Sequence, residues 1–140
     1  MTREEFSQKL IDIRVAAGVS KSDMCRLTRI SQTTLNNIEF SKQNYGILYA
    51  VLYANSLNTG ILLQSDTNSY PIDSLEDFSD WFNKEKSKHN ISLIQLASKV
   101  GSTQPTLSGI AHNSRKPKID ILLKLADYFG YTIKLQPITK

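Results

Sequence analysis

The 140-residue sequence contains a single cysteine, Cys25, only six glycines and four prolines, and no long apolar run. One thiol excludes an internal disulfide and cannot build a zinc site alone, so a reducing, cytoplasmic setting is expected. No stretch approaches the roughly 20 apolar residues that cross a bilayer. The charged beginning, MTREEFSQKL, is typical of neither a secretory signal nor a transit peptide. These absences predict a soluble globular protein with no membrane partner.

The sequence also has little excess charge, with 17 Lys and Arg against 13 Asp and Glu, or a net charge of +4. Residues 1–73 carry seven of each sign, whereas residues 74–140 carry ten basic and six acidic residues, so the whole excess lies in the second half. Such a small excess leaves open whether the partner is a nucleic acid. The sequence has no nucleophile motif, metal-ligand cluster or glycine-rich phosphate loop, so we expect no enzyme activity, no cofactor and no metal.

The chain resembles itself at an offset of 72 residues. At this offset Gln32 falls on Gln104 and Leu35 falls on Leu107, and similar pairs recur along the whole half without a gap. Because repeated sequence indicates repeated structure, we predict two tandem domains. The polar stretch between them contains a proline and has the composition of a linker. The predicted boundaries are 1–64 for the first domain, 65–73 for the linker and 74–140 for the second domain.

Apolar periodicity and helix caps predict a mainly α fold, in which each copy has about four short helices and a C-terminal strand. The second copy has the clearer caps, because Ser74, Ser92 and Thr103 precede helices and Gly101 and Gly130 end them. Predicted helices include 21–28, 32–40, 45–57 and 104–113, and the predicted strands are 60–64 and 131–136.

Each predicted strand is alone in its copy, and a lone strand has unpaired backbone groups on both edges. We therefore predict that the two strands pair as a small antiparallel ribbon. This pairing would relate the copies by a pseudo-two-fold axis and make the chain a monomeric pseudo-dimer. A homodimer in which two chains exchange strands is the alternative.

Two short helices joined by a tight turn, the second with small polar side chains, form a helix-turn-helix arrangement. The stretch 92-SLIQLASKVGSTQPTLSGI-110 resembles the lambda-repressor-like (Cro- or XRE-type) helix-turn-helix family, and 20-SKSDMCRLTRISQTTLNNIE-39 resembles it with Arg29 in place of the turn glycine. In this family Glu39 would be a structural glutamate, and Ala111 takes its place in the second copy. Four helices and a strand depart from the five-helix members and look like the antitoxin-type branch.

The resemblance implies that the helices 32–40 and 104–113 lie in the DNA major groove. Glutamine and asparagine each offer a donor and an acceptor, which match the edge of adenine. Pro105 and Gly109 weaken this face in the second copy, although Gly109 would permit a close backbone approach. The candidate base-reading residues are Gln32, Thr33, Asn36 and Asn37 in the first copy and Gln104, Thr106 and Ser108 in the second.

Contacts to DNA phosphates are expected from the residues around these two helices, and the second copy is the more basic there. Each of these residues could simply be a solvated surface residue. The repeat and the family pattern favour contact with DNA over this alternative. The candidates are Lys21, Ser31, Lys42 and Asn44 in the first copy and Thr103, Asn113, Arg115, Lys116 and Lys118 in the second.

We therefore expect a sequence-specific, double-stranded DNA-binding transcriptional regulator with two unequal readers. The alternative is an antitoxin-like or phage-derived adaptor that has partly lost DNA binding and acts through a protein partner. An adaptor would tolerate the loss of Gln32 and Arg115, whereas a regulator would not.

Overall fold

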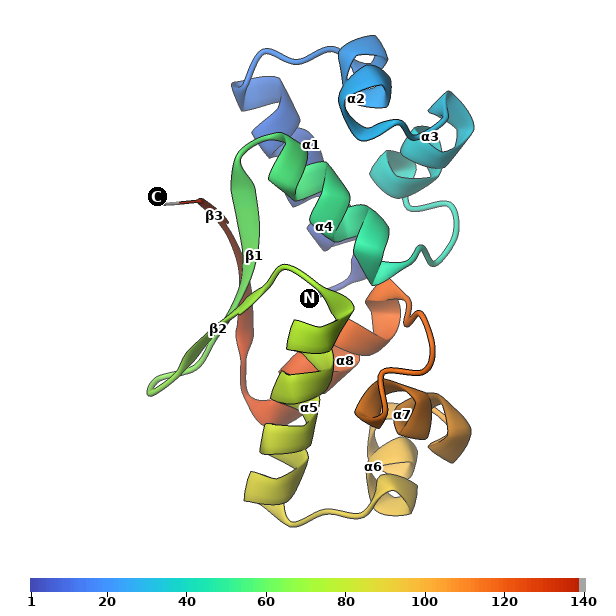
Figure 1. Ribbon diagram of the computed structural model, residues 1–140, viewed down its shortest axis with the longest axis vertical. Helices are drawn as coiled ribbons and strands as arrows, with labels where there is room; N and C mark the ends of the chain where they lie inside the picture. The colour runs from blue at the N-terminus through green and yellow to red at the C-terminus, as the bar shows by residue number, and fades with distance from the viewer. Residues whose placement is uncertain (139–140) are drawn as a thin grey trace.

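The computed structural model describes residues 1–138, which form eight α-helices and three β-strands in this part of the chain (Figure 1). The predicted mainly α class is confirmed, with four helices before β1 and four between β2 and β3. The last two residues of the predicted second domain, 139–140, lie outside the described residues. The elements are α1 (Arg3–Ala16), α2 (Lys21–Thr28), α3 (Gln32–Phe40), α4 (Ile47–Ser56), β1 (Thr59–Gln64), β2 (Ser69–Ile72), α5 (Leu75–His89), α6 (Leu93–Val100), α7 (Gln104–Ala111), α8 (Ile119–Phe129) and β3 (Thr132–Pro137).

Helix α7 is shorter than the sequence predicted. It ends at Ala111, so the predicted range 104–113 is two residues too long. Asn113 has a left-handed backbone with φ of +52°, which a continuing α-helix does not allow. The N–H of Asn113 donates to the carbonyl of Ile110 at 3.1 Å, which tightens the last turn. The basic residues that follow therefore belong to a loop.

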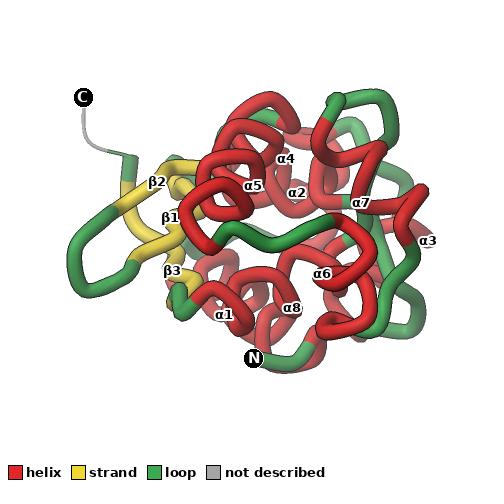
Figure 2. The backbone as a smooth tube through the Cα atoms, turned by 90° about the horizontal axis from the view of Figure 1, so that it is seen from below, coloured by secondary structure: helices red, strands yellow, loops and turns green. Residues whose placement is uncertain are grey.

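The three strands form one antiparallel sheet in the order β2-β1-β3, on one side of the helices (Figures 1 and 2). The predicted pairing of the two C-terminal strands is present as β1 with β3. The prediction of a two-stranded ribbon was incomplete, because β2 lies within the expected linker 65–73. In this polar stretch only Tyr70 and Ile72 face the core, and two inward residues are too few to indicate a strand by periodicity.

Two backbone pairings join residues that are 72 positions apart. In the sheet, Leu62 of β1 lies opposite Lys134 of β3. Outside the sheet, Gly46 and Lys118 form an antiparallel bridge. The bridge is held by the N–H of Ile119, which donates to the carbonyl of Tyr45 at 2.7 Å. When a two-fold axis relates two antiparallel segments, equivalent residues face each other where the axis passes between the segments. Both pairings are what such an axis would produce.

One core connects the two halves of the described chain. It contains Phe6 and Leu10 from α1 together with Trp81 and Phe82 from α5. Helices α1 and α4 of the first half pack against α8 of the second half. None of the described helices is long and apolar enough to span a membrane. The halves are thus joined by side-chain packing as well as by the sheet.

Candidate nucleic-acid interface

The two helix pairs α2–α3 and α6–α7 are joined by tight turns of the same construction. A left-handed residue ends the first helix of each pair: Arg29 with φ of +58° and Gly101 with φ of +66°. Glycine adopts this conformation freely, whereas Arg29 does so at a cost of about 1–2 kcal/mol. A hydroxyl residue then caps the second helix of each pair. The geometry of the turn is therefore kept although its glycine is not.

The capping residues are Ser31 and Thr103, both predicted as phosphate contacts. The hydroxyl of Ser31 accepts from the N–H of Thr34 at 3.2 Å, and that of Thr103 accepts from the N–H of Thr106 at 3.3 Å. Both side chains are exposed. Each residue thus has a structural task at the helix start, where free N–H groups also favour an anion.

Helices α3 and α7 lie on the side of the molecule away from the sheet, as Figures 1 and 2 both show. Leu35 and Ile38 bury one face of α3, and Leu107 and Ile110 bury the same face of α7. The opposite faces are therefore turned to solvent. Among the predicted base-reading residues, Gln32, Thr33 and Gln104 are exposed, and Asn36, Asn37, Thr106 and Ser108 are half-buried.

The asparagines of α3 are less free than the sequence predicted. The carbonyl oxygen of Asn36 accepts from the ammonium of Lys21 at 3.3 Å. The carbonyl oxygen of Asn37 is buried and has no hydrogen-bond partner among the described residues. Gln32 and Thr33 are left as the most accessible polar side chains at the start of α3.

Phe40 is a residue of this surface that the sequence analysis missed. Its side chain is 54% exposed at the end of α3. The ammonium of Lys21 lies 4.2 Å from the centre of its ring, and that of Lys42 lies 5.9 Å away. Both lysines that were predicted to contact phosphates in the first copy therefore lie beside one aromatic ring. The available signal was an apolar residue at a helix position outside the buried stripe of Leu35 and Ile38.

Two of the three polar residues of α7 predicted to read bases form local hydrogen bonds. The hydroxyl of Thr106 lies 2.8 Å from that of Thr103. The hydroxyl of Ser108 lies 3.4 Å from Nδ1 of His112. Hydroxyl groups can rotate, so neither contact removes the residue from the surface.

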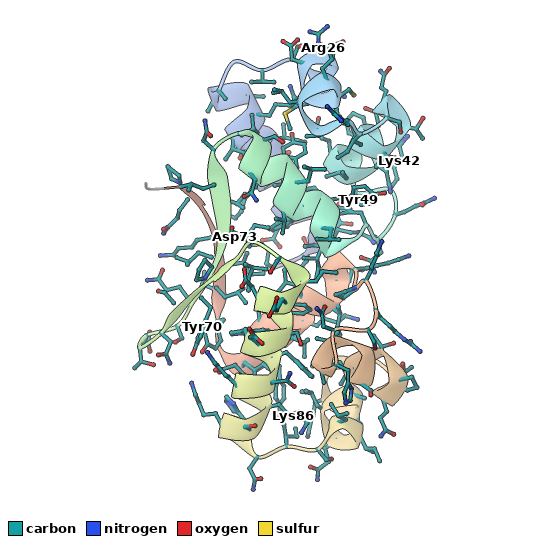
Figure 3. The ribbon with its side chains drawn as sticks, viewed as in Figure 1. Arg26, Lys42, Tyr49, Tyr70, Asp73 and Lys86 are labelled. Carbon is teal, nitrogen blue, oxygen red and sulfur yellow. The ribbon has the colours of Figure 1, made fainter. Side chains whose placement is uncertain are left out.

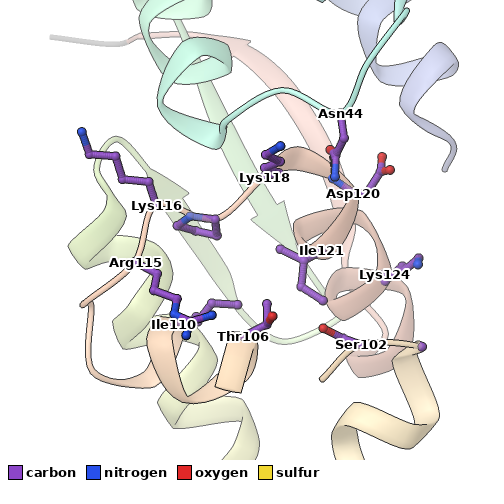
Figure 4. Close-up of a pocket in the computed structure, with 12 residues that line it drawn as sticks. Asn44, Ser102, Thr106, Ile110, Arg115, Lys116, Lys118, Asp120, Ile121 and Lys124 are labelled. Carbon is purple, nitrogen blue, oxygen red and sulfur yellow. Dashed lines mark hydrogen bonds between the residues drawn. The ribbon is translucent and has the colours of Figure 1, made fainter. Parts of the chain in front are cut away.

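In the structure, the surface over Gly109 is covered by a side chain of the protein itself. An added Cβ at this position would lie 2.6 Å from Cγ and Cδ of Arg115. The missing side chain therefore makes room for the stem of Arg115, which packs over α7. The close approach of a DNA backbone expected here would require Arg115 to move. Figure 4 shows Arg115 turned toward α7, while Lys116 points away from it.

Gly109→Ala is expected to show this coupling as a change in unfolding free energy. Alanine is favoured over a mid-helix glycine by about 1 kcal/mol. In the native chain Arg115 must move away, which offsets that gain. In an Arg115→Ala background alanine at position 109 should stabilise the chain. The effect of Gly109→Ala on the unfolding free energy should therefore differ by about 0.5–1 kcal/mol between the two backgrounds in a double-mutant cycle. Equal effects in both backgrounds would show that Arg115 does not occupy this space.

Asn44, predicted as a phosphate contact, holds the start of a helix in the other half through its carbonyl oxygen, and its phosphate contact stays a prediction. Its carbonyl oxygen accepts from the N–H of Asp120 at 3.1 Å (Figure 4). Lys118 precedes α8 and gives no side-chain cap, so Asn44 satisfies one of the N–H groups that every helix start leaves free. This contact spans 76 residues and left no local sign in the sequence.

A hollow of about 370 Å³, lined by polar and apolar residues alike, lies between α7 and α8. Ser102 and Thr106 supply hydroxyls to its wall, and Arg115 and Lys118 supply cations (Figure 4). Lys124 of α8 is a further cation of this wall that the sequence analysis did not predict, because it lies beyond the basic loop. Lys116 and Asn113 of the loop are also exposed. The lining thus contains four cations and one carboxylate, that of Asp120, and an excess of positive charge beside α7 is expected for contact with phosphates.

A buried ion pair supports α3 from behind. The guanidinium of Arg14 donates two hydrogen bonds to the carboxylate of Glu39, at 2.7 and 3.2 Å. The hydroxyl of Tyr53 donates to the same carboxylate at 2.6 Å. Burial, and then the carboxylate beside it, raise the pKa of Tyr53, so the hydroxyl stays a donor. Glu39 thus has the structural role that was expected of it, because its buried carboxylate accepts hydrogen bonds from both Arg14 and Tyr53.

The comparisons with known proteins agree with this geometry for part of the chain. Residues 85–135 match a helix-turn-helix family model, a range that contains α6, α7 and α8. No curated protein and no solved structure matches the chain. The match supports a Cro/C1-type helix-turn-helix in the second half. It covers one copy, so the predicted tandem arrangement stays a prediction. No group of metal-ligating side chains occurs within residues 1–138.

Proposed function

We propose that the chain is a sequence-specific, double-stranded DNA-binding regulator with two helix-turn-helix units, in which α3 and α7 enter successive major grooves. The observation that carries the proposal is the position of α3 and α7 on the same side of the molecule, opposite the sheet. The helix-turn-helix match over 85–135 supports it. The proposal assigns no catalytic step to the chain.

The self-paired positions support a two-fold relation between the units. Leu62 faces Lys134, and Gly46 faces Lys118, each pair being 72 residues apart. A two-fold relation would place the reading helices about 34 Å apart along one face of the duplex. A single chain would then cover two half-sites that other proteins of this kind cover with two subunits.

The units differ in what they offer to DNA. Gln32 and Thr33 give the first unit exposed amide and hydroxyl groups, whereas Pro105 occupies the position of Thr33 in the second. The second unit has Arg115 and Lys116 where the first has Gln43 and Asn44. We infer that the first unit reads more bases and that the second binds phosphates more strongly. The expected operator is therefore an imperfect inverted repeat.

Selection of bound duplexes from a random DNA pool tests this function. An imperfect inverted repeat is expected, with half-sites about 10 base pairs apart. Binding should weaken steeply with salt, because phosphate contacts release counterions. Absence of any enriched sequence would refute the regulator and favour the protein-interaction adaptor.

Gln32→Ala and Gln104→Ala form a matched pair for this test, because they occupy equivalent positions at the start of α3 and α7. Each loss is expected to cost about 1–3 kcal/mol of binding and to relax a different half-site. Repeating the selection with each variant locates the effect. Identical motifs for both variants and the native chain would contradict base reading by these residues.

A further inference from the structure

Helix α4 exposes three neighbouring apolar side chains that the DNA interface does not use. Leu48, Tyr49 and Leu52 are 41%, 44% and 40% exposed, and we call them the α4 patch. They line a hollow of about 390 Å³ together with Gly46 and Pro117. Figure 3 shows Tyr49 on the outer side of α4. A contiguous apolar surface of this kind marks a contact with another molecule more often than a scattered residue does.

The fold itself does not require this exposure. At the equivalent positions α8 has Asp120, Ile121 and Lys124 in place of the three residues of the α4 patch. Asp120 accepts from the guanidinium of Arg3 at 3.3 Å, and Ile121 is buried. A helix in the same setting is thus built with charged side chains outside. The three positions of α8 that correspond to the α4 patch therefore expose no apolar side chain.

The rim of the hollow is positively charged. Lys116 and Lys118 line it, and both are exposed. Neither forms an ion pair with any residue in the described range 1–138. The lining contains no acidic residue. A partner that covers the patch thus meets two free cations beside an apolar floor.

We propose that the α4 patch binds an acidic, amphipathic segment of a partner protein. Apolar side chains of the segment fill the hollow between Tyr49, Leu52 and Pro117, and its carboxylates pair with Lys116 and Lys118. Opposite charges at the rim select such a segment over a neutral or basic one. Buried apolar contacts at the centre provide most of the affinity.

Binding of the partner segment is expected to regulate DNA binding, because both use the same two lysines. This inference rests on the proposed DNA-binding function. Lys116 and Lys118 are also the proposed phosphate contacts of the second unit. A partner segment that neutralises them removes charge that DNA binding needs. Partner and operator therefore compete for the same chain.

A phage-displayed library of random 16-residue peptides, selected on the immobilised full chain without DNA, tests the proposal. Peptides that combine apolar residues with Asp or Glu should be enriched. The double variant Leu48→Asp/Leu52→Lys places the residue types of α8 on α4 and should bind a synthesised winner about 30-fold more weakly. Lys116→Glu/Lys118→Glu should shift the selection toward basic peptides.

Ile94→Lys on α6 is the control, because Ile94 is a 66% exposed apolar residue far from the patch in sequence. It should leave binding of the winner unchanged, and thermal melts should show that every variant is folded. Enriched peptides that bind Leu48→Asp/Leu52→Lys as well as the native chain would overturn the proposal, and so would the absence of acidic peptides.

Addition of an operator duplex separates this proposal from the regulator proposal. Displacement of the bound peptide supports competition at the lysines, and simultaneous binding refutes it. If the chain binds the peptides but selects no DNA sequence, the partner site is supported and the proposed regulator function is refuted.

Discussion

Glu39→Ala is expected to lower the free energy of unfolding by about 3–5 kcal/mol. The substitution leaves the guanidinium of Arg14 without its carboxylate in a place where that side chain is only 11% exposed. It also leaves the buried hydroxyl of Tyr53 without its acceptor. Total stabilities of folded domains are about 5–15 kcal/mol, so the variant should be near its unfolding threshold. Urea denaturation followed by circular dichroism measures the loss.

Two further variants show whether the loss comes from the broken pair. Arg14→Met/Glu39→Met/Tyr53→Phe removes both charges and the hydroxyl together, and should recover much of the stability. Arg26→Ala breaks the exposed pair of Arg26 with Asp23 and should leave the midpoint unchanged. A Glu39→Ala midpoint close to that of Arg26→Ala would contradict a structural role for the buried pair.

Arg115→Ala/Lys116→Ala is expected to weaken binding to the selected duplex about 30-fold at 0.15 M salt. Log affinity falls with log salt by about 0.9 per phosphate contact, so the loss of two contacts should make this negative slope shallower by about 1.8. The preferred DNA sequence should stay the same, because phosphate contacts carry no base information. Fluorescence anisotropy at several salt concentrations measures both quantities.

Lys84→Ala/Lys134→Ala removes the same charge on the side of the sheet. The ammonium of Lys84 lies 5.6 Å from the ring centre of Tyr70 in β2, and Lys134 is exposed on β3. Its salt slope should equal that of the native chain. If the salt dependence became equally shallow in both double variants, net charge, and not contact at the basic loop, would determine affinity.

Local hydrogen bonds explain why most helix boundaries could be predicted from the sequence. In the capping boxes of Thr2 with Glu5 and of Ser92 with Gln95, each residue satisfies a backbone N–H three positions away. Gly101 and Gly130 end their helices with left-handed backbones, as predicted. All of these interactions lie within one helical turn, so their residues are neighbours in the sequence as well.

Long-range contacts explain where the prediction of the site was incomplete. The sequence predicted Asn44 only as a phosphate contact, but its acceptor oxygen also meets an N–H from a segment 76 residues later. Gly109 lies against Arg115 because a turn brings the basic loop back over α7. Neither contact has a periodicity or a motif that a single sequence displays.

The amino-acid sequence alone determined the mainly α class, the helix-turn-helix segments, most helix ends and the pairing of the two C-terminal strands. These features depend on caps, on apolar periodicity and on the rule that a strand must pair. The tertiary structure decided that β2 joins the sheet, that Asn44 caps α8 and that the α4 patch lies beside two free lysines. Such features depend on which distant side chains meet when the core closes, and only the folded chain brings them together.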